Sequence, residues 1–183
     1  MKYKGVKNNF VSHLSFRVVE GSDAEFVTSL RLNDKLNQYL SNVNNDVAAQ
    51  RHWISKYKQR ESRREEFYFV IMEGSRRLGL VRIYDFNDDS FCWGSWMLLP
   101  NSPSYAAIES ALFVYEFGFY ELGFSSSHFD VRRENLKVVS FHKKFGAKVV
   151  SESELDYFFE ITKETYLAAK QKYRKFLSTD TSS

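Results

Sequence analysis

Both prolines of this chain, Pro100 and Pro103, lie within four positions of each other, and this pairing constrains the fold more than any other feature. They separate a strand-like run that ends at Leu99 from a helix-like run that opens near Ala106. Proline ends a strand, and it is favoured at the first helical position, where no N–H is needed. The pair therefore predicts a strand-to-helix junction with Ser102 as the helix cap and Pro103 at the first helical position.

A junction of this kind has a possible function as well as a structural role. Backbone N–H groups at a helix N-terminus carry partial positive charge and bind anions, often pyrophosphate. Neither the Walker pattern nor the glycine-rich dinucleotide fingerprint is present. The junction thus has two interpretations: it binds an anion, or it only ends a strand and begins a helix.

The remainder of the chain alternates between strand-like and helix-like patterns, with 43% hydrophobic and 17% aromatic residues to fill a core. The predicted strands cover residues 16–19, 67–72, 78–84, 91–99, 127–132, 148–151 and 157–161. The predicted helices cover residues 22–36, 46–60, 106–122, 135–144 and 165–177, with Gly123 ending the third of them. This order predicts one mixed α/β domain over residues 1–177 and a disordered tail over 178–183.

Composition excludes several classes of protein. The net charge of +3 is too small for a nucleic-acid-binding surface, and the basic positions of residues 60–66 alternate with glutamates and are expected to be solvated. No apolar run approaches the roughly 20 residues of a membrane span, and the first nine residues lack a signal-peptide core. Cys92, the single cysteine, has no disulfide partner and is expected to be a structural thiol. We therefore expect a soluble, cytoplasmic protein.

Several motifs occur together along the chain. The junction reads NSPSYA over residues 101–106, and a later stretch reads NLKVVSFHKKFGA over 135–147. The first part of the chain contributes FRVVE (16–20), DAEF (23–26), LR (30–31), QRHWI (50–54) and YFVI (68–71). Together these motifs resemble the GNAT superfamily of N-acetyltransferases, in the subgroup that includes the ribosomal-protein and amino-sugar acetyltransferases, over roughly residues 14–150.

The resemblance implies a fold and a cosubstrate. The GNAT fold is a mixed, mostly antiparallel twisted sheet flanked by helices, with one splayed parallel strand pair. The cosubstrate is acetyl-CoA, bound by a loop of pattern Gln/Arg-x-x-Gly-x-Gly/Ala, in which Asn101 stands for the Gln/Arg, Ser104 for the first Gly, and Ala106 matches. The cofactor-binding residues carried over are Leu98, Leu99, Asn101, Ser104, Tyr105, Ala106, Ala107 and Asn135.

Two further residues take catalytic roles by the same resemblance. Some relatives carry a Glu as general base in Leu-Glu-Val-Arg-x-x-Asn and a Tyr acid twelve residues later. Here residues 129–135 read FDVRREN, which puts Asp130 at the base and His142 at the acid position. Aspartate reaches less far than glutamate, and an unperturbed imidazole, with a pKa near 6.5, exchanges protons at neutral pH. The alternatives are a salt bridge of Asp130 with an arginine and a helix histidine that meets solvent or a carbonyl.

The acceptor is expected near the first two helices. Aromatic walls with a few hydrogen-bonding groups suit a sugar ring or a small amine, and the residues concerned are Arg31, Asn33, Trp53, Trp93 and Trp96. The two tryptophans at 93 and 96 are more typical of a core than of a ligand cage. No histidine has metal-ligand spacing, so no metal site is expected.

The preferred interpretation is an N-acetyltransferase that acts on a primary amine, such as that of a nucleotide-linked amino sugar. Two alternatives stay open: a protein N-terminal acetyltransferase of the ribosomal-protein type, and a GNAT-fold binding module without transferase activity. A homodimer is conceivable through Phe113, Phe117 and Tyr120, which share one side of the predicted helix.

Overall fold

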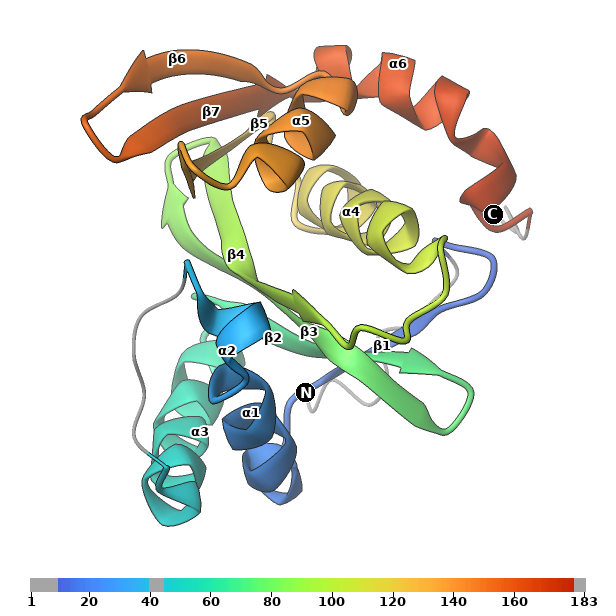
Figure 1. Ribbon diagram of the computed structural model, residues 1–183. Helices are drawn as coiled ribbons and strands as arrows, with labels where there is room; N and C mark the ends of the chain where they lie inside the picture. Colours follow the sequence, from blue (N-terminus) through green and yellow to red (C-terminus); the bar gives the residue numbers. More distant parts are fainter. Residues whose placement is uncertain (1–9, 40–44, 180–183) are drawn as a thin grey trace.

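The computed structural model describes residues 10–39 and 45–179, which form a seven-stranded sheet of order β1-β2-β3-β4-β5-β7-β6 (Figure 1). The strands are β1 (Ser15–Val18), β2 (Phe67–Glu73), β3 (Arg76–Asn87), β4 (Ser90–Leu98), β5 (Ser126–Arg132), β6 (Lys148–Glu152) and β7 (Asp156–Thr162). Every neighbouring pair is antiparallel except β4–β5, which is parallel. The predicted fold class is therefore confirmed. The division at residue 177 stays a prediction, because residues 180–183 of the expected tail lie outside the described residues.

Helices cover both faces of this sheet (Figure 1). They are α1 (Ala24–Arg31), α2 (Asp34–Asn37), α3 (Val47–Ser62), α4 (Ala106–Glu116), α5 (Leu136–Lys144) and α6 (Lys163–Lys172). Side chains alternate along β3, so Leu80 packs in the cluster under α1 and α3, whereas Val81 and Ile83 pack in the cluster under α4. The alternation creates two separate cores, one on each face.

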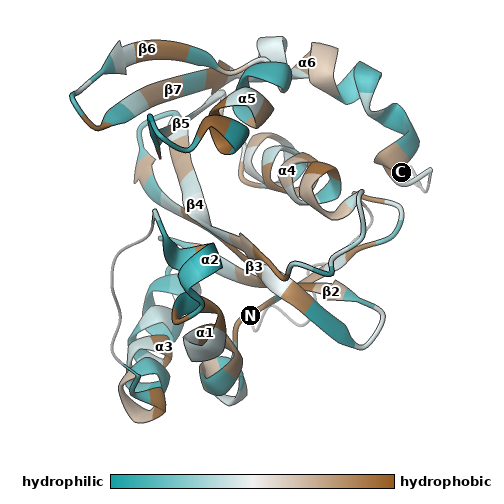
Figure 2. Ribbon diagram, viewed as in Figure 1, coloured by the Kyte–Doolittle hydropathy of each residue, from teal (hydrophilic) through white to brown (hydrophobic). Residues whose placement is uncertain are grey.

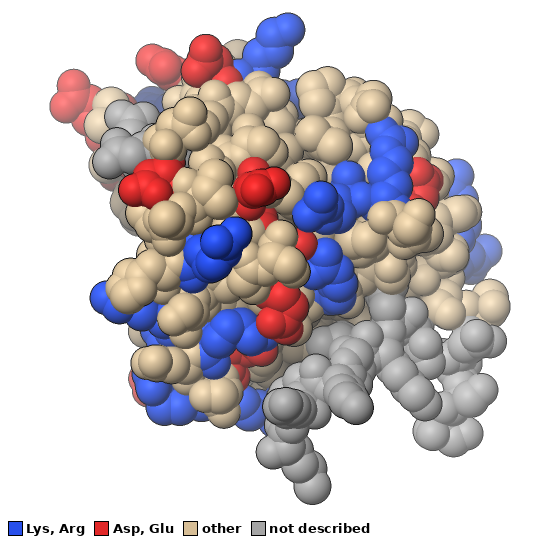
Figure 3. All heavy atoms as spheres, turned by 90° about the horizontal axis from the view of Figure 1, so that it is seen from below, with Lys and Arg blue, Asp and Glu red and all other residues tan. Residues whose placement is uncertain are grey.

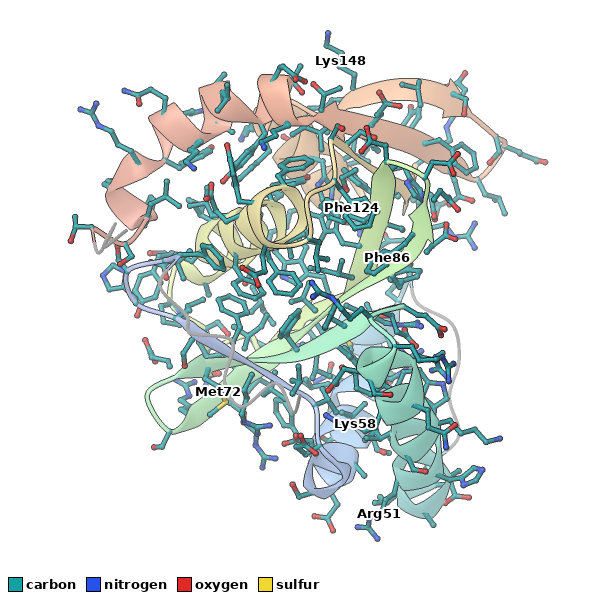
Figure 4. All side chains as sticks on the ribbon, turned by 180° about the vertical axis from the view of Figure 1, so that it is seen from behind. Arg51, Lys58, Met72, Phe86, Phe124 and Lys148 are labelled. Atoms are coloured by element: carbon teal, nitrogen blue, oxygen red, sulfur yellow. The ribbon has the colours of Figure 1, made fainter. Side chains whose placement is uncertain are left out.

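The core under α4 is built largely from aromatic rings. The rings of Phe16 and Phe113 stack with centroids 3.8 Å apart, and Phe86 and Phe124 meet at 5.0 Å at the opposite end of this layer (Figure 4). Phe113 and Phe117 are completely buried, whereas Tyr120 is 43% exposed. A dimer surface made of these three side chains is therefore wrong, because two of them fill the core of the monomer.

The strand-to-helix junction is longer than predicted. The Ser102 N–H donates to the Leu99 carbonyl and the Ala106 N–H donates to the Pro103 carbonyl, both over 3.0 Å. These two turns occupy the loop before α4 begins at Ala106, with Tyr105 as its N-cap. The prediction that Ser102 caps the helix and Pro103 opens it is therefore wrong, although the position of the junction is confirmed. At the far end, α4 continues as a π-helical turn, Phe117–Glu121, before Gly123 adopts a positive φ of 84°.

The outer surface differs between the ends of the molecule. Exposed apolar side chains gather on β6, β7 and the turn between them, where Figure 2 shows brown segments; they are Val149, Val150, Leu155 and Phe158. On the side seen from below, basic and acidic side chains are intermixed (Figure 3). Among the described residues, no helix has the length and apolar character needed to cross a membrane.

Candidate active site

The central feature of the site is the place where β4 and β5 separate. Their parallel ladder pairs Ser90 with Ser126 and ends at Cys92 and His128. Beyond this point β4 continues along β3 and β5 continues along β7, so the strands diverge and the predicted splayed parallel pair is present. A cleft of about 370 Å³ opens there. Its walls are formed by Tyr39, Arg82, Tyr84, Trp93, Gly94, Ser95, Trp96, Phe129, Asp130, Val131, Arg132, Asn135, Val138 and His142.

A bulge in β4 shapes one wall of the cleft. Leu80 pairs with Met97 and Arg82 pairs with Gly94, so β4 has one residue more than β3 between these pairs. Ser95 lies in this bulge with a positive φ of 46°, a conformation that non-glycine residues rarely adopt. A bulge leaves backbone groups outside the regular ladder, and strained backbone concentrates at functional sites. Ser95 therefore gives the cleft backbone groups that a regular strand would use for pairing.

Asp130 lies on the open side of the cleft. Side chains alternate along β5, so Phe129 and Val131 enter the core under α4 while Asp130 faces the opposite side, and it is exposed. Its neighbour Arg132 pairs with Asp156 over 3.1 Å. Arg132 therefore forms its salt bridge with Asp156 and not with Asp130. The Asp130 carboxylate is thus available at the cleft.

Arg82 lies in the same cleft and is held by a buried carboxylate. Glu66 is only 3% exposed, and Arg82 Nε donates to Glu66 Oε2 over 2.5 Å. Arg60 also bonds this carboxylate, so two guanidinium groups share one negative charge. The expectation that residues 60–66 are uniformly solvated is wrong for Glu61 and Glu66, which are both buried. The network leaves a net positive charge beside the cleft.

His142 has a different environment from the one expected. Its side chain is 4% exposed, and its ring lies 4.4 Å from the ring of Phe129 and 5.1 Å from that of Trp93, centroid to centroid. Burial lowers the pKa of His142 to about 3, so the imidazole is neutral at pH 7. The expectation of a titration near pH 6.5 is wrong, because the surrounding aromatic rings disfavour the charged form. Its Nδ1 atom is buried and has no hydrogen-bond partner among the described residues.

The predicted cofactor residues fall into two groups. Asn101 and Ser104 are exposed on the junction loop, Leu98, Leu99 and Ala107 are half-buried, and Ala106 is buried at the start of α4. Tyr105 stacks on His13 with ring centroids 4.4 Å apart and donates to Glu73, which raises the pKa of Tyr105 to about 12. Asn135 lies apart from the loop: it caps α5, where its Oδ1 accepts from the Val138 N–H over 3.4 Å, and it lines the cleft.

The predicted acceptor residues do not all meet. Trp93 and Trp96 line the cleft with ring centroids 5.3 Å apart, and Trp93 also belongs to the core. Trp53 does not line the cleft; it packs against Arg82, whose guanidinium carbon lies 5.4 Å from the centroid of the Trp53 ring. Asn33 caps α2, and Arg31 ends α1; neither lines the cleft. The fold therefore brings the two tryptophans of β4 together with the predicted catalytic pair, and it leaves the other three acceptor residues outside the cleft.

Sequence reasoning missed several cleft residues, among them Arg82, Tyr84 and Ser95. The alternation of β3 placed Arg82 and Tyr84 on one face, but only tertiary contacts put that face beside β5. No pattern in the sequence signals the bulge at Ser95.

Other reactive groups behave as structural elements. Burial raises the pKa of the Cys92 thiol to about 11, which suits the structural role predicted for it. Within residues 10–39 and 45–179, no three His, Cys, Asp or Glu side chains gather so as to hold a metal ion.

Comparisons with known proteins agree with this geometry. A family model described as "Acetyltransferase (GNAT) domain" matches residues 13–148. A solved structure described as "Apo FdhC- a nucleotide-linked sugar GNAT" is 46% identical, with a TM-score of 0.85, over 92% of this chain and 97% of that one. No curated protein sequence matches the chain significantly.

More distant structures share the fold alone. A mutant spermidine/spermine N-acetyltransferase SpeG from Vibrio cholerae has 16% identity and a TM-score of 0.70, over 86% of this chain and 98% of that one. A GNAT-family acetyltransferase from Bacillus anthracis has 17% identity and a TM-score of 0.69, over 85% of this chain and 99% of that one.

Proposed function

This chain belongs to the GNAT acetyltransferase family, and from that membership we propose that it is an acetyl-CoA-dependent N-acetyltransferase whose acceptor is the primary amine of a nucleotide-linked amino sugar. The observation that carries the proposal is the cleft between β4 and β5, with the Asp130 carboxylate on its open side. The likeness to a nucleotide-linked sugar GNAT supports the acceptor class. The cytoplasmic location and the homodimer stay predictions.

The walls of the cleft favour this kind of acceptor. Trp93, Trp96 and Tyr84 offer aromatic surface for a sugar ring, and Arg82 offers positive charge for a phosphate group. Arg82 shares its carboxylate partner with a second arginine, so its charge is only partly neutralised. This combination favours a sugar that carries a nucleotide over an uncharged amine.

Acetyl-CoA supplies the thioester whose acetyl group is transferred. The chain has groups that fit such a molecule: Asn101 and Ser104 are exposed on the loop before α4, and the buried Ser102 Oγ has no hydrogen-bond partner among the described residues. Backbone N–H groups at the start of α4 would hold the diphosphate, and these donors are present whatever side chains the loop carries. Asn135, at the cleft itself, would bind the pantetheine arm.

Asp130 and His142 have separate roles in this proposal. Asp130 takes a proton from the acceptor ammonium, so that the free amine can attack. A neutral imidazole carries no positive charge but can donate a hydrogen bond. His142 would therefore stabilise, by a hydrogen bond, the negative charge that develops on the carbonyl oxygen or the departing sulfur. Backbone groups in the Ser95 bulge would assist at the same oxygen.

Two measurements test the proposal. Calorimetry with CoA and with acetyl-CoA should give saturable heats, and a thiol-release assay should then be run over a panel of amines. The panel contains a nucleotide-linked amino sugar, the same sugar without the nucleotide, a polyamine and a peptide with a free N-terminus. We expect the highest kcat/KM for the nucleotide-linked sugar. No saturable heat with either cosubstrate would favour a binding module, and a preference for the peptide would favour a protein acetyltransferase.

A further inference from the structure

Tyr84 shares the open face of the sheet with Asp130. Tyr84 is paired with Cys92 across β3 and β4, and Cys92 is paired with His128 across β4 and β5. Asp130 follows His128 by two residues, so its side chain returns to the same face. Tyr84 and Asp130 both line the cleft. The phenol and the carboxylate therefore reach the same hollow from two strands that flank β4.

A glycine on the intervening strand makes room for the phenol. A methyl group placed on Gly94 would lie 3.1 Å from the Tyr84 hydroxyl oxygen and 3.6 Å from its Cε1 atom. The Tyr84 hydroxyl thus lies over β4, where a Cβ at position 94 would crowd it. On its other side, the guanidinium carbon of Arg82 lies 4.5 Å from the centroid of the Tyr84 ring. These contacts fix the ring and direct the hydroxyl toward β5.

The Tyr84 hydroxyl keeps its proton. Burial raises the pKa of Tyr84, and the neighbouring Cys92 and Asp130 raise it further. The phenol therefore stays neutral over the pH range of an enzyme assay, and it can accept one hydrogen bond while it donates another.

We propose that Tyr84 is a catalytic residue that relays the acceptor's proton to Asp130. In this step the Tyr84 oxygen accepts a proton from the acceptor ammonium while its own proton passes to the Asp130 carboxylate. The phenol is unchanged overall, Asp130 becomes neutral, and the amine gains the lone pair with which it attacks the thioester. The relay compensates for the short reach of aspartate at a position where relatives carry glutamate. This inference rests on the proposed function.

The decisive variant is Tyr84→Phe, which keeps the ring and removes the hydroxyl. Loss of a proton relay should lower kcat for the acceptor by about 100-fold, while the Kd for acetyl-CoA stays unchanged. Tyr120→Phe is the matched control, because Tyr120 lies on the surface and packs against Lys163 and Lys170. The control should retain the full kcat.

A rescue variant separates a relay from a structural role. In Tyr84→Phe with Asp130→Glu, the longer carboxylate reaches the amine directly, so the kcat of the double variant should exceed that of Tyr84→Phe by about tenfold or more. Gly94→Ala gives an independent test because its methyl group would crowd the hydroxyl at 3.1 Å and push it off its position. It should lower kcat in the unsubstituted protein and have no added effect in the Tyr84→Phe background.

Each result decides between the possibilities. A kcat for Tyr84→Phe within about twofold of the unsubstituted protein would overturn the relay and leave the proposed function standing, because a proton-transfer group contributes far more than that. Failure of Asp130→Glu to restore any activity in the Tyr84→Phe background would also overturn it. If the unsubstituted protein transfers acetyl to no amine on the panel, the proposed function itself fails, and the relay fails with it.

Discussion

The two predicted catalytic groups lie on opposite faces of the sheet, and their surroundings differ sharply. Asp130 is exposed at the open side of the cleft, beside polar and charged residues of β3 and β5. His142 is buried on α5 among the rings of Trp93, Phe129 and Phe159. The side with Asp130 can exchange protons with water and the acceptor, whereas the side with His142 is apolar and disfavours a charged side chain.

This difference separates two kinds of catalytic contribution. A base must be accessible to the acceptor and able to change its charge. A group that stabilises developing charge acts best in a dry, preorganised site, where hydrogen bonds are stronger. We infer that the open face handles the proton and the buried face handles the thioester.

The largest expected effect comes from removing the charge on the open face. Asp130→Asn keeps the size of the side chain but cannot take a proton. We expect kcat to fall by about 10²- to 10⁴-fold, with the Kd for acetyl-CoA unchanged, in a thiol-release assay paired with calorimetry. Glu154→Gln, on the exposed turn between β6 and β7, is the control and should retain full activity. Retention of activity in Asp130→Asn would remove the carboxylate from the mechanism.

Burial of His142 should make the free energy of unfolding depend on pH. The folded protein keeps His142 neutral down to about pH 3, whereas the unfolded chain protonates it near pH 6.5. The unfolded state therefore binds more protons between these values, and the free energy of unfolding falls as the pH drops below 6.5. The loss attributable to this residue between pH 7 and pH 5 is about 2 kcal/mol.

Urea unfolding at pH 7 and pH 5 measures this effect. His142→Gln lacks the titrating group, so its stability should fall by about 2 kcal/mol less than that of the unsubstituted protein over the same interval. His52→Gln, at an exposed position of α3, should keep the original pH dependence. Equal pH dependence in His142→Gln and the unsubstituted protein would contradict a buried, neutral imidazole.

The smallest expected effect concerns the loop before α4. If the Ser104 hydroxyl contacts a phosphate oxygen, Ser104→Ala should weaken acetyl-CoA binding by about 1 kcal/mol, roughly a fivefold rise in Kd. Ser104→Gly removes the same hydroxyl but restores the backbone room of the family's loop. Calorimetry on both variants separates these contributions: an unchanged Kd in Ser104→Ala would show that the Ser104 hydroxyl makes no contact with the cosubstrate.

The sequence predicted the order of the elements better than the details of their ends. The prolines located the junction correctly, because proline limits the backbone wherever it lies. They did not reveal that two turns precede α4, since Pro103 is equally compatible with a turn and with a first helical position. The helix then starts at Ala106, without the serine cap that the pattern suggested.

Motifs led to three residues that the fold places in one cleft, and the roles of these residues stay predictions. Asp130, Asn135 and His142 were chosen from a spacing along one stretch of chain, and they line one cleft. Arg82 and Tyr84 could not be chosen in this way, because they lie on a different strand and become neighbours of the site only across β4. The predicted environment of His142 failed for the same reason: the pKa of a side chain depends on what surrounds it, and most of those rings come from other elements.

The sequence by itself determined the family, the alternation of strands and helices, and the chemical identity of the groups that can carry protons. These properties are local, because they follow from residue type and spacing. Only the tertiary structure decided that β4 and β5 separate after three residue pairs, that Ser95 bulges, and that Gly94 leaves room for the Tyr84 hydroxyl. Those features arise from packing between distant segments. They determine which side chains come into contact, which are shielded from water and which carry a charge.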